Sequence, residues 1–105
     1  MEEISKNHTK YFIGYHIVFC TKYRNQLEEP HRIELKKIFY EISQEYEWKI
    51  ESLEITEDHV HLYVLGDPET KPNEISKTFK SISAVYLFER FQKLKQRKFW
   101  GSGLW

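Results

Sequence analysis

Two histidines separated by one residue are the feature of this sequence best suited to chemistry. His59 and His61 lie in the run Asp58-His59-Val60-His61-Leu62, in which polar and apolar residues alternate as they do in a β-strand. Side chains two positions apart on a strand share one face and lie roughly 6.6 Å apart along it. Two imidazoles at this separation can bind one metal ion, or they can be polar residues on the solvent side of a strand. The spacing alone leaves both interpretations open.

The elements that must position these histidines follow from hydrophobic periodicity and turn signals. They are, in chain order, a strand at 10–23, a helix at 30–46, a strand at 48–55, a strand at 59–65, a helix at 73–91, a basic connection at 92–99 and the start of a fourth strand at 100–105. The short turn at 56–58 makes the second and third strands an antiparallel hairpin, and Asn73 is the expected N-cap of the second helix. This order predicts an α+β fold of the ferredoxin-like split β-α-β type, with two helices on one face of an antiparallel sheet.

Periodicity also assigns residues to the core. The first helix has an apolar stripe, and the first strand has apolar residues on both faces, so we expect its second face to be covered and Cys20 to be buried. The expected core positions of the two helices are Leu35, Ile38, Phe39, Ile42, Tyr46, Ile75, Phe79, Ile82, Tyr86 and Leu87. If the odd positions of the first strand and the even positions of the third both meet the helices, His16 lies on the same open face as His59 and His61.

Composition narrows the class of protein. The 105 residues are 40% hydrophobic and 16% aromatic, which excludes a disordered segment, and the apolar runs are too short to span a membrane. The single cysteine excludes an internal disulfide, and no secretory signal is visible at the N-terminus. We therefore expect one soluble, cytoplasmic domain covering residues 1–105, with no membrane partner.

Charge is balanced overall but unevenly distributed. Residues 1–69 hold eight basic and fourteen acidic side chains, whereas residues 70–105 hold eight basic and two acidic ones. Two groups of cations could contact a polyanion, although each could also be a solvated end of a helix or strand. They are Lys22 and Arg24, which flank Tyr23, and the cluster of Arg90, Lys93, Lys95, Arg97 and Lys98.

Three segments together resemble a known family. These are Tyr15-His16-Ile17-Val18-Phe19-Cys20-Thr21-Lys22-Tyr23-Arg24, the strand Asp58-His59-Val60-His61-Leu62, and the ending Phe99-Trp100-Gly101-Ser102-Gly103-Leu104-Trp105. In this order they resemble the HUH tyrosine transposases, which move insertion sequences as single-stranded DNA and have the transposases associated with repetitive extragenic palindromes as relatives. The resemblance covers nearly the whole chain and implies the same ferredoxin-like fold.

The resemblance implies roles for several residues. His59 and His61 would hold a divalent ion, magnesium or manganese, that polarises the scissile phosphate while a tyrosine attacks it. Imidazole does not itself select magnesium, so the identity of the ion depends on the resemblance. Lys22, Tyr23, Arg24 and the cationic cluster from Arg90 to Lys98 would contact hairpin DNA, and the protein would be a homodimer.

No catalytic residue is assigned, because the family's nucleophilic tyrosine lies on a helix after the fourth strand, beyond Trp105. We therefore expect a chain truncated before that helix and inactive alone. Tyr63 is expected to be a partly exposed strand aromatic and Tyr86 a core residue. His16 could bind metal, orient a phosphate or make a hydrogen bond beside the metal site, and we favour the last. His8 and His31 are expected to be solvated.

Three hypotheses follow from the sequence. The first is a transposase that binds single-stranded hairpin DNA and a divalent ion, and the second is a non-catalytic nucleic-acid-binding module derived from one. The third is a structural metal-binding or interaction domain without a DNA role. Failure to bind nucleic acid at low salt, where phosphate contacts are strongest, would favour the third.

Overall fold

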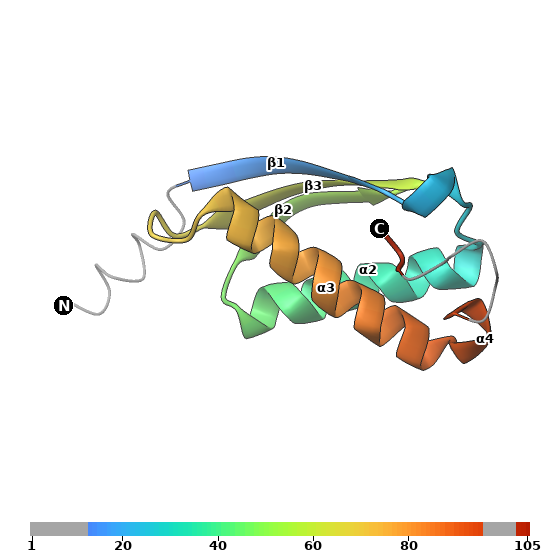
Figure 1. The fold of residues 1–105 in the computed structure, drawn as a ribbon. Coiled ribbons are helices and arrows are strands. Elements are labelled where there is room, and N and C mark those ends of the chain that lie inside the picture. Colours follow the sequence, from blue (N-terminus) through green and yellow to red (C-terminus); the bar gives the residue numbers. More distant parts are fainter. Residues whose placement is uncertain (1–12, 96–102) are drawn as a thin grey trace.

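The computed structural model describes residues 13–95 and 103–105. Within them the chain forms β1 (Ile13–Cys20), a 3-10 turn η1 (Lys22–Arg24), α2 (Glu29–Glu45), β2 (Lys49–Ile55), β3 (His59–Gly66), α3 (Pro72–Arg90) and a short α4 (Gln92–Lys95). The sheet is antiparallel with strand order β1-β3-β2, and α2 and α3 both cover one of its faces (Figure 1). The predicted α+β architecture is confirmed.

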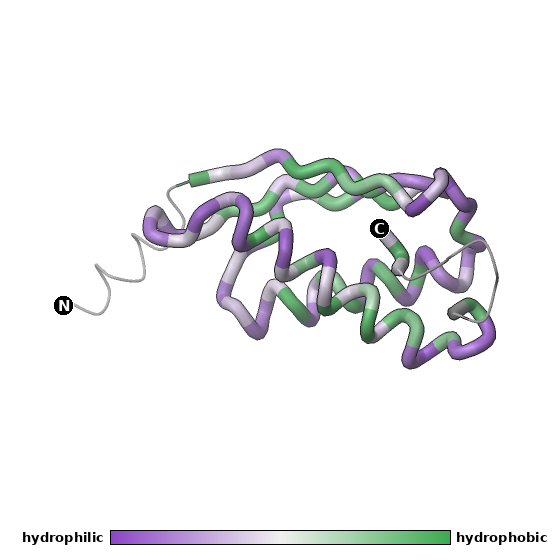
Figure 2. The backbone as a smooth tube through the Cα atoms, in the orientation of Figure 1, coloured by the Kyte–Doolittle hydropathy of each residue, from purple (hydrophilic) through white to green (hydrophobic). Residues whose placement is uncertain are grey.

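The core lies between the sheet and the two long helices. Val60, Leu62 and Val64 of the central strand point toward the helices and are almost fully buried. Figure 2 shows hydrophobic and hydrophilic stretches alternating along α2 and α3. The fully buried helix residues confirm most of the predicted stripe, namely Leu35, Ile38, Phe39, Ile42, Ile75, Phe79 and Leu87. Tyr46 was expected in this stripe but is exposed, because α2 ends at Glu45 and Tyr46 stacks on Trp48.

A bulge in β2 explains why its two faces were poorly sorted in the sequence. The pairing with β3 shifts between Ile50 and Ser52, so Glu51 is an extra residue. Ile50 therefore faces the core with Leu53 and Ile55, despite the different parity of its position. On the opposite face the bulge brings Ser52 beside Tyr63, and Glu54 follows beside His61.

The structure corrects the predicted end of β1, the predicted N-cap of α3 and the segment that follows α3. The first strand ends at Cys20 rather than residue 23, because Tyr23 and Arg24 have φ of 58° and 56°, in the left-handed region that strands do not use. Asn73 is not the N-cap of α3, since Lys71 occupies that position. The basic connection begins with the short helix α4, which buries Leu94.

The C-terminal residues lie between the sheet and the helices (Figure 1). Leu104 is fully buried, and its carbonyl oxygen accepts a hydrogen bond of 2.9 Å from the backbone N–H of Lys22. Trp105 packs on Phe19 and donates its indole N–H to the hydroxyl of Ser83, 3.0 Å away. Residues 103–105 are not in a strand, and the rest of the expected fourth strand lies outside the described residues.

No membrane-spanning helix occurs among residues 13–95 and 103–105, since neither long helix combines the required length and hydropathy.

Candidate metal centre and nucleic-acid interface

The face of the sheet opposite the helices carries the candidate chemistry. In the antiparallel register His16 pairs with Tyr63, Val18 with His61 and Cys20 with His59, and side chains of directly paired residues share a face. His16, His59 and His61 therefore lie on one open face, as the alternation predicted. The expectation that this face is covered was wrong for the described residues, because Val18 is 55% exposed and Cys20 is also exposed.

His59 and His61 approach each other closely enough to share an ion. Their ring centroids are 4.9 Å apart and their ring planes are nearly perpendicular. Among the described residues, no third His, Cys, Asp or Glu completes a cluster able to hold a metal. The protein thus offers two imidazole ligands. They can hold a divalent ion if water or a substrate oxygen completes its coordination sphere.

Asp58 orients the first of these imidazoles. Its Oδ1 lies 2.8 Å from His59 Nδ1, and Thr56 Oγ1 lies 2.9 Å from the same nitrogen. The hydrogen bond with His59, followed by the charge and hydrogen bond of Arg24, lowers the pKa of Asp58. An ionised Asp58 favours the tautomer with the proton on Nδ1, which leaves Nε2 as the basic nitrogen for a metal.

The cationic turn at the end of β1 is fixed beside the histidines. The Arg24 Nε lies 3.1 Å from Asp58 Oδ2, so one carboxylate contacts both Arg24 and His59. The buried Thr21 ties the same region together, because its backbone N–H and hydroxyl both donate to the carbonyl oxygen of Asp58, at 2.9 and 3.2 Å. These bonds hold the start of η1, the turn in which Tyr23 and Arg24 have positive φ. The side chain of Tyr23 is 78% exposed.

The second group of predicted cations has a different environment. Arg90, at the end of α3, donates to Glu34 at 2.6 Å and to Glu41 at 2.9 Å, both on α2. These two carboxylates raise the pKa of Arg90, so its charge is compensated on the helical layer rather than beside the histidines. Lys93 is exposed on α4, at the same end of the molecule as η1 (Figure 1). Lys95 belongs to α4, whereas Arg97 and Lys98 lie outside the described residues.

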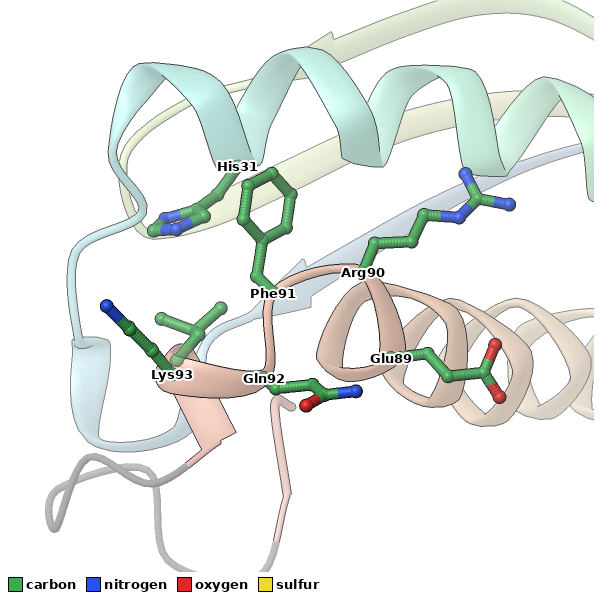
Figure 3. Close-up of a pocket in the computed structure, with 7 residues that line it drawn as sticks. His31, Glu89, Arg90, Phe91, Gln92 and Lys93 are labelled. Carbon is green, nitrogen blue, oxygen red and sulfur yellow. The ribbon is translucent and has the colours of Figure 1, made fainter.

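His31 is buried, contrary to the expectation that it is solvated. Phe91, at the end of α3, packs edge-on against its ring with the centroids 4.7 Å apart. Both residues line a pocket of about 480 Å³, which α4 also lines. Figure 3 shows their rings next to each other. The helical spacing was the available signal in the sequence, because His31 lies four residues before Leu35 on the stripe that Ile38 and Ile42 continue. His8 lies outside the described residues.

Two residues of the site, Asp58 and Thr56, were given no role in the sequence analysis, because both lie in the predicted turn at 56–58. The position of Asp58 directly before His59 was the available signal. Tyr63 is partly exposed, as expected, and it stacks on His16 with the centroids 4.3 Å apart. Tyr86 is half-buried against the core and lies under the guanidinium of Arg90.

Known transposases are similar to this chain in sequence. The family model for IS200-like transposases matches residues 9–105. The ISDra2 transposase TnpA of Deinococcus radiodurans is 32% identical over 90% of this chain and 68% of its own length. The IS200 transposase of Salmonella typhimurium is 30% identical over 97% of this chain and 70% of its own length.

A solved structure gives the same result. A crystal structure described as a transposase from Deinococcus radiodurans superimposes with a TM-score of 0.83 and 33% identity, over 90% of this chain and 73% of that one. The family match over nearly all of the sequence agrees with the α+β architecture. The chain belongs to the IS200-like transposase family.

Proposed function

We propose that this protein binds single-stranded hairpin DNA and a divalent cation, magnesium or manganese, as part of DNA transposition. The observation that carries the proposal is the junction of a cationic turn with the histidine pair through Asp58, which contacts both Arg24 and His59. Lys22 and Arg24 supply charge for phosphates, and the exposed Tyr23 between them supplies a ring for base stacking. The DNA backbone would then pass the open face that holds His59 and His61.

The two histidines are the proposed ligands of the cation. When bound, the ion would act as a Lewis acid on a phosphate oxygen and hold that phosphate in place. His59 would bind through Nε2, because Asp58 accepts the proton of Nδ1, and His61 would bind from the next position on the same face. Arg24 is positioned to hold the neighbouring phosphate. Because only two protein ligands are proposed, binding of the cation alone is expected to be weak.

We also propose that the protein is a homodimer. Among the described strands β1 and β2 are the edges of the sheet, and an exposed edge favours pairing with a second chain.

Binding is tested with a fluorescently labelled DNA hairpin carrying a single-stranded extension, compared with a fully paired duplex of the same sequence. Anisotropy at low salt should show tighter binding of the hairpin. Manganese binding is measured separately by calorimetry on the unmodified chain and on a variant with both His59→Ala and His61→Ala. Absence of hairpin binding at low salt would overturn the DNA proposal. Unchanged manganese affinity in the double variant would overturn the metal site.

Strand cleavage is tested on the 105-residue polypeptide with manganese and labelled hairpins. We propose binding without a covalent protein–DNA product, because no tyrosine in the sequence matches the family's nucleophile position. A covalent band that disappears in Tyr63→Phe or in Tyr86→Phe would contradict this proposal and would identify the nucleophile. Tyr40→Phe, on the outer side of α2, is the matched control.

A further inference from the structure

His16 and Tyr63 form an aromatic pair on the open face of the sheet, and Tyr63 lies two residues after His61 on β3. His16 and Tyr63 are directly paired across β1 and β3, with ring centroids 4.3 Å apart and an angle of 17° between the rings. His16 is exposed and Tyr63 is partly exposed. Two parallel rings at the surface form a platform on which a third planar group can stack.

The backbone next to the pair is built to admit the tyrosine ring. A Cβ atom placed on Gly14 would overlap the hydroxyl oxygen of Tyr63 and would lie 2.7 Å from two of its ring carbons. Tyr63 therefore occupies the space that a side chain at position 14 would need. Glycine at this strand position allows the ring to lie over β1 and against His16.

The platform forms part of an open groove of about 410 Å³ along the sheet. Val18 and His61 lie farther along it, and Ser52 and Glu54 of β2 form its other side. Glu54 pairs with His61 and Ser52 with Tyr63, so all of these residues share the open face. The groove thus combines stacking surfaces with a hydroxyl and a carboxylate.

The charge distribution indicates which part of a nucleotide suits the groove. The carboxylate of Glu54 repels a phosphate but can accept a hydrogen bond from the exocyclic amino group of a base. Cations are instead found at η1, beyond the end of the groove that His61 and Val18 line. A DNA strand with its phosphates at Lys22 and Arg24 would therefore direct a base, rather than its backbone, into the groove.

We propose that the His16–Tyr63 pair is a stacking site for one unpaired nucleobase that bears an exocyclic amino group, next to the histidine pair. This inference rests on the proposed binding of single-stranded DNA and adds a specific contact to it. The base extends the two-ring stack, and its amino group faces Ser52 and Glu54. The site is separate from the cationic turn, so its loss should weaken binding without abolishing phosphate contacts.

The test is photocrosslinking of a DNA hairpin whose single-stranded extension carries 5-iodocytosine at one position at a time. After trypsin digestion, His16 lies in the peptide 11–22 and Tyr63 in the peptide 50–77. We expect one extension position to crosslink to one of these peptides. Tyr63→Ala should remove that crosslink and lower hairpin affinity about 5- to 150-fold, the range for loss of one stacked base.

Matched variants separate stacking from folding. Gly14→Ala changes neither ring but displaces the end of the flexible Tyr63 side chain, so it should also reduce the crosslink. Tyr63→Phe keeps the ring and should preserve it, as should Tyr40→Ala, which removes an exposed tyrosine from α2. Circular dichroism on each variant confirms the fold.

Each other outcome identifies which idea fails. A hairpin that binds but crosslinks only outside these two peptides, or an affinity unchanged by Tyr63→Ala and Gly14→Ala, overturns the stacking site and leaves DNA binding intact. Variants that change the sedimentation coefficient but not the crosslink would show that a second copy of the chain covers the groove, which also overturns it. Absence of hairpin binding at low salt overturns the proposed function itself.

Discussion

Asp58 and His59, neighbours in the chain, are joined through their side chains, with 2.8 Å between Asp58 Oδ1 and His59 Nδ1. The contact orients the imidazole of His59, together with Thr56 Oγ1, which lies 2.9 Å from the same nitrogen. It also places a carboxylate between the metal-binding candidate and Arg24, whose Nε lies 3.1 Å from the other oxygen of Asp58. Asp58 thus links the proposed phosphate-binding turn to the proposed metal site.

Removal of this carboxylate should weaken metal binding without removing a ligand. We expect Asp58→Ala to lower manganese affinity about 10- to 100-fold, the usual effect of losing a partner that orients a histidine ligand. Calorimetric titration measures the affinity, and Glu69→Ala, beyond the opposite end of β3, serves as the control. An affinity equal to that of the unmodified chain would show that Asp58 does not orient His59.

Much of the architecture could be predicted because its determinants are local. Alternation along the strands and 3.6-residue periodicity along the helices located the three strands and both long helices, and strand parity placed His16 with His59 and His61. The end of β1 was missed because Tyr23 has a high strand propensity, whereas its positive φ is imposed by bonds among Thr21, Asn25 and Asp58.

The contacts that define the site could not be predicted in the same way, because they join distant parts of the chain. Arg24 and Asp58 are 34 residues apart, and Arg90 is 49 residues from Glu41. The two groups of cations therefore looked equivalent in the sequence. The tertiary structure distinguishes them, because it places Arg24 beside the histidines and pairs Arg90 with carboxylates of α2. The burial of His31 likewise depends on packing by Phe91.

The two groups of cations should differ in their effect on DNA binding. Removing one cation that binds a phosphate of single-stranded DNA makes the slope of log affinity against log salt shallower by about 0.7. We expect this change for Lys22→Ala and for Arg24→Ala, measured by anisotropy over a salt series. Arg90→Ala should change the slope less, because two carboxylates, Glu34 and Glu41, compensate its charge. Arg24 has one carboxylate partner, Asp58, which it shares with His59. A larger change for Arg90→Ala than for Arg24→Ala would reverse this assignment.

Dimer formation should be visible in the free protein. We expect sedimentation equilibrium to give twice the monomer mass in the upper part of a concentration series from micromolar to hundred-micromolar. The physical reason is the unpaired edge of β1 among the described strands. A monomer mass across the whole series would contradict the homodimer.

The connection between β3 and α3 should make stability depend on pH. Asp67 Oδ1 accepts hydrogen bonds of 2.9 Å from the backbone N–H groups of Glu69 and Thr70, and Oδ2 accepts one of 2.7 Å from the Thr70 hydroxyl. The Thr70 hydroxyl first, and then the backbone N–H groups, lower the pKa of Asp67. Because the pKa in the folded state lies below the unfolded value of about 3.9, the ionised carboxylate stabilises the fold above that pH. This stabilisation is lost as pH falls through the folded pKa.

Replacement of Asp67 by asparagine tests this linkage, because asparagine has nearly the same shape and cannot ionise. We expect Asp67→Asn to lower the free energy of unfolding by about 1 kcal/mol at pH 7, the difference between charged and neutral hydrogen bonds. Urea titrations from pH 7 to pH 2 should show the two proteins converging as Asp67 becomes protonated. Glu69→Gln removes a neighbouring carboxylate but leaves these three hydrogen bonds in place, so it should match the unmodified chain at each pH. A gap between the Asp67→Asn and unmodified proteins that stays constant down to pH 2 would mean that the shape of the side chain, not its charge, stabilises the turn.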